Sequence, residues 1–378
     1  MIYLNQAATT YPKPQRVHEA YAAALQQPPA GQFRSAAREG KDVFGECRRK
    51  LGRLFGIADS DRIFFSCGAT DSANAVIYGL GLKGRNVVVT QTEHNSILRP
   101  LWNLREQVGS VTVVPCDALG YVRPCDVEAA LTEETAAVFV NHCSNVTGMV
   151  QDLEAIGRIV HRRGVLFVVD ASQSAGCLPV RADDWGIDAL IFTGHKSLFG
   201  VPGTGGYFVR EGVRLVPYRF GGTGRNSRQI VYENEDYEYE PGTQNTPGIA
   251  ALDAGVSYVL ERGVERIVRG EEEKMRFLYE GLSAFRQVKL YGEPGRNKGP
   301  VLSFNVEPFS SSDVAYILQG SYGIVVRTGL HCAPLIHRAL GTKKDGTVRV
   351  SLSDLTKTSD VEALVRAVGE IAESGCKI

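Results

Sequence analysis

The sequence predicts an α/β protein with a mostly parallel β-sheet between helices, followed by a smaller α+β domain. Two observations lead to this prediction. Between about residues 60 and 210, short apolar runs alternate with segments of helical spacing, which is typical of a parallel sheet. Beyond residue 242, long helical patterns come first and strands follow them. The length of 378 residues also fits two domains.

The expected strands of the large sheet are apolar along most of their length, as strands covered on both faces must be. They lie at 62–65, 86–90, 111–114, 136–140, 165–169 and 189–192. Helical spacing separates them. In the segment 152–163, for example, Asp152 is the expected N-cap and Gly164 the expected stop.

The C-terminal part of the chain does not show the alternation of strands and helices. The pattern predicts two long helices, at 246–262 and 264–286. Two strands follow, at 301–306 and 324–327, and a last helix begins at about residue 359. Two polar segments precede them, at 220–228 and 232–239, and we expect both to be surface loops.

The composition excludes several classes of protein. Lys and Arg number 42 and Asp and Glu also 42, so the formal net charge is zero, which argues against a general binder of nucleic acid or of membrane surfaces. The first residues show no secretory signal, and no window approaches the roughly 18 apolar residues of a membrane span. The eight cysteines form no CxxC pair. We therefore expect no structural metal, no nucleic acid, no membrane, and a reducing cytoplasm.

Ligands of open parallel sheets bind beyond the carboxyl ends of the strands, so the residues that follow each apolar run are the candidates for a site. Small residues at 66–72 lead into a helix, where free N–H groups could hold a phosphate or simply form a capped turn. His94 follows the second run and a polar stretch at 141–148 follows the run of 136–140. A single histidine is more often a satisfied polar group than a catalyst.

Asp170 and Lys196 follow the next two runs. A carboxylate there needs a cation or an N–H donor as its partner, although an aspartate is also a common N-cap. Burial at a strand end lowers the pKa of a lysine and frees its amine for a Schiff base. Together, the phosphate turn, the histidine, the aspartate and the lysine form the set that pyridoxal 5'-phosphate needs.

A second candidate site lies in the small domain. Cys332 follows Arg327 and His331 within five residues, and these neighbours favour the thiolate, whereas a buried structural cysteine is the alternative. Arg349 lies within an expected strand, where its guanidinium could hold a substrate carboxylate or form a structural salt bridge.

With these residues, the chain resembles the group II cysteine desulfurases and selenocysteine lyases, within the class V aminotransferase family of fold type I pyridoxal-phosphate enzymes. The most specific pieces are Thr-Gly-His-Lys at 193–196, Arg-Thr-Gly-Leu-His-Cys-Ala at 327–333 and Glu-Pro-Gly-Thr-Gln-Asn-Thr at 240–246. The resemblance implies a seven-stranded sheet in a large domain over 16–250. It also implies a small domain over 251–378 that includes residues 1–15 and carries the acceptor cysteine.

The resemblance also implies a role for individual residues. Lys196 would form the Schiff base, and His94 would stack on the cofactor ring as a further catalytic candidate. The other cofactor contacts would be Asp170 to the pyridine nitrogen, Gln173 to the phenolic oxygen, and Ala69, Thr70, Thr193 and His195 to the phosphate. Thr243 would reach the phosphate of a neighbouring subunit, which implies a homodimer with shared sites. Asn145, Arg327 and Arg349 would bind the substrate.

The function that we expect is a pyridoxal-phosphate-dependent cysteine desulfurase. It would convert L-cysteine to L-alanine and leave the sulfur on Cys332 as a persulfide, from which a sulfur- or selenium-acceptor protein could take it. One alternative is a selenocysteine lyase that acts on L-selenocysteine. Another is a class V aminotransferase or epimerase, in which Cys332 is incidental. A non-enzymatic carrier is a third, against which Lys196, Asp170 and Cys332 argue.

Overall fold

The computed structural model describes residues 1–27, 42–222, 228, 230–231, 239–293 and 298–375. The predicted large sheet has seven strands: β2 (Ile63–Ser66), β3 (Asn86–Thr90), β4 (Ser110–Val114), β5 (Thr135–Asn141), β6 (Leu166–Asp170), β7 (Ala189–Thr193) and β8 (Gly205–Val209). Their order across the sheet is β2-β8-β7-β6-β5-β3-β4. The strands from β7 to β4 are parallel, and β8 runs antiparallel to both of its neighbours. The prediction of a mostly parallel sheet is confirmed.

Each of the six strands predicted for this sheet is present, with bounds that shift by at most one residue. The alternation of side chains explains why these strands are apolar throughout. Val87 and Val89 pack on one face of the sheet and Val88 packs on the other. Because helices cover both faces, residues that point to either face must be apolar.

Helices cover both faces of this sheet. One face packs against α3 (Ala69–Gly79) and α4 (Asn95–Asn103). The other packs against α2 (Val43–Phe55), α5 (Pro124–Ala130), α6 (Leu153–Arg162) and α7 (Thr246–Arg262). The predicted helix at 152–163 is α6, and Asp152 caps it as expected by accepting a hydrogen bond from the Ala155 N–H. The helix predicted over 246–262 is α7, with the same bounds.

A second, antiparallel sheet forms the small domain. Its strands are β9 (Val288–Tyr291), β10 (Val301–Val306), β12 (Arg327–Gly329) and β13 (Thr347–Ser351), in the order β12-β13-β10-β9. Helices α8 (Val264–Ser283), α9 (Ser311–Tyr322) and α11 (Thr358–Gly375) pack on it around a separate apolar core. The strand expected at 324–327 is divided, because β11 (Ile324–Val325) pairs instead with β1 (Ile2–Tyr3) at the N-terminus.

The remaining elements are α1 (Gln15–Leu25), which packs on α7, the single turn η1 (Ser60–Arg62), and the short helix α10 (Ile336–Ala339). The loops expected at 220–228 and 232–239 lie largely outside the described residues. A division of the chain between residues 250 and 251, which falls within α7, stays a prediction. In the described part of the chain, no helix combines the length and the apolar character that a bilayer crossing requires.

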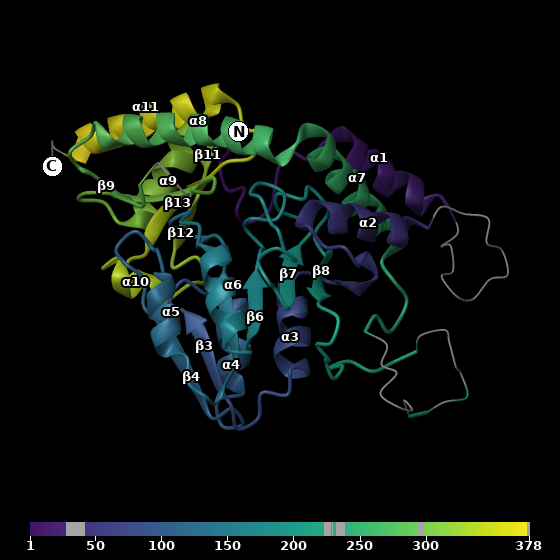
Figure 1. Cartoon of the computed structure of the whole chain (residues 1–378). Helices are drawn as coiled ribbons and strands as arrows, with labels where there is room; N and C mark the ends of the chain where they lie inside the picture. The colour runs from purple at the N-terminus through teal and green to yellow at the C-terminus, as the bar shows by residue number, and fades with distance from the viewer. Residues whose placement is uncertain (28–41, 223–227, 229, 232–238, 294–297, 376–378) are drawn as a thin grey trace.

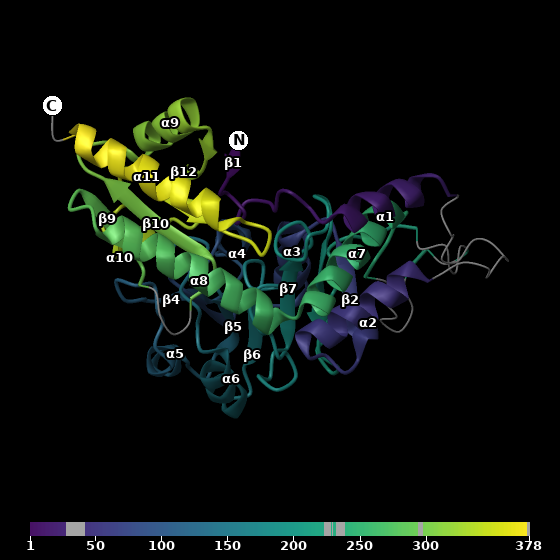
Figure 2. The same cartoon turned by 90° about the horizontal axis from the view of Figure 1, so that it is seen from above.

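The small domain lies over the strand ends of the large sheet. Figure 1 shows the arrowheads of β6 and β7 pointing towards the small domain. Figure 2 shows α8 and α11 lying side by side above the small sheet, and these two helices are in contact. The carboxyl ends of the parallel strands therefore end beneath the small domain, where a site is expected.

Candidate active site

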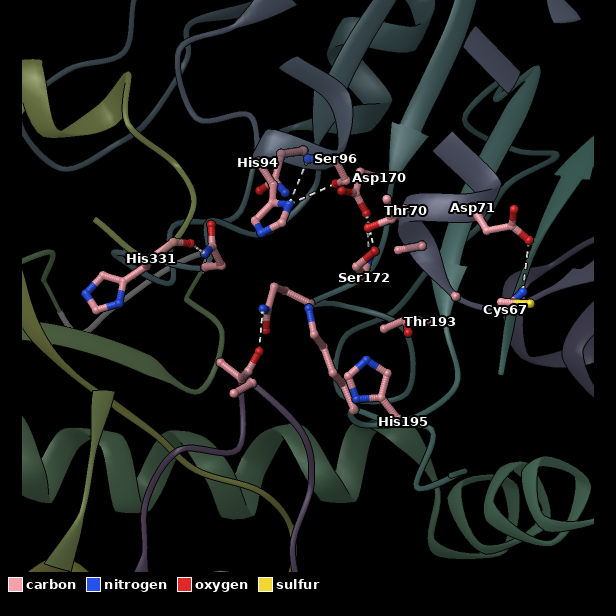
Figure 3. Close-up of a pocket in the computed structure, with 18 of the residues that line it drawn as sticks. Cys67, Thr70, Asp71, His94, Ser96, Asp170, Ser172, Thr193, His195 and His331 are labelled. Carbon is pink, nitrogen blue, oxygen red and sulfur yellow. Dashed lines mark hydrogen bonds between the residues drawn. The ribbon is translucent and has the colours of Figure 1, made fainter. Parts of the chain in front are cut away.

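A cavity of about 570 Å³ lies where the large sheet meets the small domain. Residues from both parts of the chain line it, and Figure 3 shows His94, Asp170, Thr193, His195 and His331 around the same space. The predicted site residues that line it are Ala69, Thr70, His94, Asn145, Asp170, Gln173, Thr193, His195, Lys196, Arg327 and Arg349. Cys332 and Thr243 do not line it.

The first turn of α3 opens into this cavity. Gly68 is the N-cap, with φ of 137°, and no side chain of the described residues caps the helix. The free N–H groups of the first turn and the positive end of the helix dipole therefore favour an anion here. Two buried polar atoms beside it have no hydrogen-bond partner among the described residues, namely Thr193 Oγ1 and His195 Nδ1. Burial lowers the pKa of His195 to about 4.

Asp170 is the last residue of β6 and is buried. Its Oδ1 accepts hydrogen bonds from the Ser172 N–H at 2.9 Å and from Ser172 Oγ at 2.5 Å. These donors supply the partner that a buried carboxylate needs. Next along the chain, the Gln173 side chain donates to the Ala7 carbonyl at 3.0 Å, so this residue ties the strand end to the N-terminal segment.

His94 caps the N-terminus of α4. Its Nδ1 accepts a hydrogen bond from the Ser96 N–H at 3.0 Å, which leaves Nε2 to carry the proton and orients the ring. Burial, together with the positive charge of Lys196, lowers the pKa of His94 to about 4. The ring is therefore neutral at physiological pH, which suits a residue that stacks on another ring.

Lys196 lies in the turn that follows β7 and is partly buried. Desolvation lowers the pKa of its amine to about 8, although the negative charge of Asp170 acts in the opposite direction. About a tenth of the amine is consequently uncharged at pH 7, far more than at an ordinary lysine, and this fraction can act as a nucleophile.

Arg349 is almost completely buried and lies on β13. Its Nη1 donates to the Asn145 carbonyl and its Nη2 to Asn5 Oδ1, both at 3.0 Å, while Nε has no partner among the described residues. Arg327 lies directly opposite on β12. Burial and this second cation lower the pKa of Arg349 to about 9. Two guanidinium groups thus meet at one wall of the cavity, which favours an anionic ligand.

Cys332 lies on the loop that follows β12, next to the cavity. Arg327 Nη2 donates a hydrogen bond to Cys332 Sγ at 3.4 Å. The backbone carbonyl of Cys332 accepts another from the Asn95 N–H at 2.7 Å. Asn145 donates through Nδ2 to the carbonyl of the preceding His331 at 2.6 Å. His331 and Cys332 both have positive φ, of 50° and 59°. The Asn95 backbone N–H and the Asn145 side chain, both from the large domain, therefore hold this loop in an unfavourable backbone conformation.

Sequence reasoning missed three residues of the site. Asn5 holds Arg349 but is 344 residues distant from it, so no local pattern could indicate the contact. Ser172 could have been suspected as a donor to Asp170 from its spacing. Glu93 precedes His94 and is completely buried, with Oε1 accepting from Thr90 Oγ1 at 2.6 Å and from the Asn141 N–H at 2.7 Å.

Glu93→Gln is expected to flatten the pH dependence of stability. Burial raises the pKa of Glu93 to about 8, whereas an unfolded chain has the ordinary value of about 4.5. Between these values the native state binds the extra proton, so wild-type stability falls as pH rises, by at most about 1.4 kcal/mol per pH unit. Denaturant unfolding from pH 5 to 8 should show a shallower decline for the variant. An unchanged slope would contradict a neutral Glu93.

The fold and the site together define a class. The architecture is that of the fold type I enzymes. It combines a mostly parallel sheet covered by helices on both faces with a second domain above its strand ends. Between them lie a lysine of lowered pKa, a buried carboxylate and a helix N-terminus without a side-chain cap. The predicted fold class is confirmed by the structural neighbours described next.

The chain belongs to the class-V aminotransferase family. The sequence profile of that family, described as "Aminotransferase class-V", matches residues 2–364. A relative from Methanothermobacter thermautotrophicus, a "Probable cysteine desulfurase", is 35% identical over 384 residues, which cover 99% of this chain and 95% of the relative.

Two solved structures are also similar. The apo structure of a cysteine desulfurase from Thermococcus onnurineus NA1 has a TM-score of 0.87 and 30% identity, over 99% of this chain and 95% of that one. The cysteine desulfurase CsdA from Escherichia coli, in an S-sulfonic acid form, has a TM-score of 0.88 and 25% identity, over 98% of this chain and 94% of that one.

Proposed function

We propose that the protein is a pyridoxal-phosphate-dependent cysteine desulfurase. The observation that carries the proposal is the position of Cys332, whose Sγ accepts a hydrogen bond from Arg327 beside a cavity that contains Lys196 and Arg349. An amine nucleophile, a carboxylate-binding guanidinium and a thiol next to one cavity are what removal of sulfur from an amino acid requires. The similarity to proteins named cysteine desulfurase supports the same function.

The residues of the cavity fit pyridoxal phosphate. Thr193 Oγ1 and His195 Nδ1 are buried polar atoms without partners, and they lie by the N-terminus of α3 with Ala69 and Thr70, where a phosphate would satisfy them. Asp170 would hold the pyridine nitrogen, Gln173 the phenolic oxygen, and His94 the face of the ring. The cofactor, when bound, withdraws electrons from the bonds of the amino acid's Cα.

Substrate binding and proton transfer would fall to residues of the chain itself. Arg349 would bind the substrate carboxylate through its unpartnered Nε, and Asn145 would orient the substrate through its unpartnered Oδ1. Lys196 would take the proton from Cα, since its amine is partly uncharged at neutral pH.

The Cys332 thiolate would then attack the sulfur of the substrate. A bond forms between the two sulfur atoms while the bond between that sulfur and the substrate Cβ breaks. The electron pair of the broken bond stays with Cβ, which is reduced and takes a proton, so that L-alanine leaves. The transferred sulfur is oxidised to the persulfide level on Cys332. Because Arg327 lies 3.4 Å from Sγ, its charge would support the attacking thiolate.

Two further proposals concern the setting of this reaction. Thr243 is exposed and does not line the cavity of its own subunit, which suits a contact with the phosphate of a second copy in a homodimer. A persulfide and the exposed free thiols of Cys67 and Cys125 are compatible with a reducing compartment, so we propose a cytoplasmic enzyme that passes sulfur to an acceptor protein.

The test is to incubate the holoenzyme with L-cysteine alone and to measure alanine together with protein-bound sulfur. The proposal predicts alanine without any keto acid, and mass spectrometry should find one added sulfur atom on the peptide that contains Cys332. The same assay with L-selenocysteine examines the closest alternative. Efficient turnover of selenocysteine with negligible turnover of cysteine would make the protein a selenocysteine lyase, and a requirement for a keto acid would indicate an aminotransferase.

Asn5→Ala is expected to raise the KM for L-cysteine by about ten-fold while kcat changes by less than about two-fold. Asn5 Oδ1 accepts from Arg349 Nη2, so its loss frees the guanidinium to rotate away from the carboxylate. Asn305→Ala is the matched control, because Asn305 lies on β10 and donates to the Gly346 carbonyl outside the cavity. Equal KM values for the two variants would show that Asn5 does not position Arg349.

A further inference from the structure

A second cavity, of about 600 Å³, lies apart from the catalytic cavity. It lies between α8 and the segments that contain Leu178 and Lys298, and its lining residues are Cys177, Leu178, Val268, Glu271, Glu272, Met275, Arg276, Glu280, Lys298, Gly299 and Pro300. It shares no lining residue with the first cavity. The proposed reaction at Cys332 does not use it.

Glu271 contributes an unpaired carboxylate to this cavity. The residue is 3% exposed, and its Oε2 has no hydrogen-bond partner in the part of the chain that the structure describes. Lys274, a cation on the same helix that acts on Glu271, is already engaged, since its Nζ donates to the Thr356 carbonyl at 2.9 Å. Burial raises the pKa of Glu271 well above its ordinary value.

Lys298 contributes an unpaired ammonium. It is 8% exposed, and its Nζ has no hydrogen-bond partner among the described residues; the ring of Tyr279 lies 5.8 Å away. Burial lowers the pKa of Lys298 to about 8. Glu271 and Lys298 do not form an ion pair with each other in the described structure. Two buried ionisable groups, an acid and a base, therefore line one cavity without hydrogen-bond partners, and the pKa shifts of both towards the neutral form reflect those missing partners.

We propose that this cavity is a binding site for a free α-amino acid with an apolar side chain. The ammonium group of such a ligand pairs with Glu271 and its carboxylate with Lys298, so that one zwitterion satisfies both groups. Leu178, Val268 and Met275 offer apolar surface to its side chain. A simple anion or cation would leave one of the two charges unpaired.

The wall of this cavity is continuous with the loop that carries Asn145. The Gly299 N–H donates to the Gly148 carbonyl at 2.7 Å, and Cys177 Sγ donates to the Gln173 carbonyl at 3.1 Å. No side chain fits at Gly148, where φ is 74° and a Cβ would lie 2.4 Å from the Val301 carbonyl oxygen. Because Gln173 lines the catalytic cavity and Cys177 lines the second one, the two cavities lie close together, on either side of closely packed segments.

The test uses N,N-dimethyl-L-leucine and the holoenzyme. This zwitterion keeps one ammonium proton for Glu271, but its tertiary amine cannot form an imine at the catalytic site. Isothermal titration calorimetry should detect binding to the wild type at millimolar concentration. Lys298→Met and Glu271→Gln should each weaken binding by about ten-fold or more. Val268→Trp, which fills the cavity and changes neither charge, should abolish it.

Arg349→Lys is the control, since it alters the catalytic cavity alone and should leave the affinity for the probe unchanged. Loss of binding in Arg349→Lys, with affinity retained in Lys298→Met and Glu271→Gln, would assign the probe to the catalytic cavity and overturn the proposal. The absence of binding to the wild type would also overturn it. Lys298→Met removes a buried amine that has no hydrogen-bond partner among the described residues, so its melting temperature should not fall and a folding defect will not mask the result.

Discussion

Lys196→Ala is expected to reduce alanine formation by at least about a thousandfold and to remove the visible absorption of the covalent lysine–cofactor linkage. The physical reason is the loss of the partly uncharged amine, of pKa about 8, that the cavity provides for both the linkage and the Cα proton. The measurement is alanine release from L-cysteine, together with an absorption spectrum after pyridoxal phosphate is added. Wild-type turnover in this variant would remove Lys196 from the mechanism.

A second substitution at Lys196 tests whether the uncharged amine or the positive charge is required, and a substitution at another lysine is the control. Lys196→Arg keeps a cation in the turn after β7, but a guanidinium stays protonated and is a poor nucleophile, so this variant should be as inactive as Lys196→Ala. Lys357→Ala removes an exposed lysine ahead of α11 and should behave as the wild type. Substantial activity in Lys196→Arg would mean that charge alone suffices.

Cys332→Ala has the second largest expected effect. Alanine formation from L-cysteine should fall by at least about a hundredfold, and no sulfur should remain on the protein, because the nucleophile that accepts the sulfur is gone. Turnover of L-selenocysteine should fall much less, since selenide is a better leaving group and needs the attacking thiol less. The measurement compares alanine release from the two substrates.

Cys67→Ala is the matched control for that prediction. Cys67 is the other thiol at the catalytic cavity and is exposed, but it lies at the phosphate end, beside α3, and not near Arg349. Its removal should leave desulfuration intact. If Cys67→Ala abolished sulfur transfer and Cys332→Ala did not, the sulfur acceptor would have to be reassigned.

Much of the fold could be predicted from the sequence, because strands buried on both faces are apolar throughout. The exception in the large sheet is β8, whose direction also differs. Its first two residues are glycines, since a Cβ at Gly205 would lie 2.6 Å from the Gly68 Cα and one at Gly206 would lie 2.5 Å from the Phe64 carbonyl oxygen. Close packing next to the α3 turn thus removes the apolar side chains that would have marked the strand.

The candidate site was predictable to the extent that its residues follow strands directly. His94, Asp170 and Lys196 come at strand ends, and the topology brings them to one edge of the sheet. Asn5 and Glu93 were not predictable in the same way. Asn5 reaches Arg349 because a bridge to Ser351 places the N-terminal segment beside β13, and Glu93 contacts the site through the Asn141 N–H. Such supporting contacts depend on tertiary structure and leave no periodic pattern.

The opposed guanidinium groups of Arg327 and Arg349 make the free enzyme locally frustrated. Like charges that face each other across a β-ladder oppose folding, and the neighbours of Arg349 relieve this only with neutral oxygen acceptors. An anion that enters between them relieves the repulsion. Part of the binding energy of such an anion is then relief of this repulsion, so an anionic ligand is expected to stabilise the small domain against unfolding.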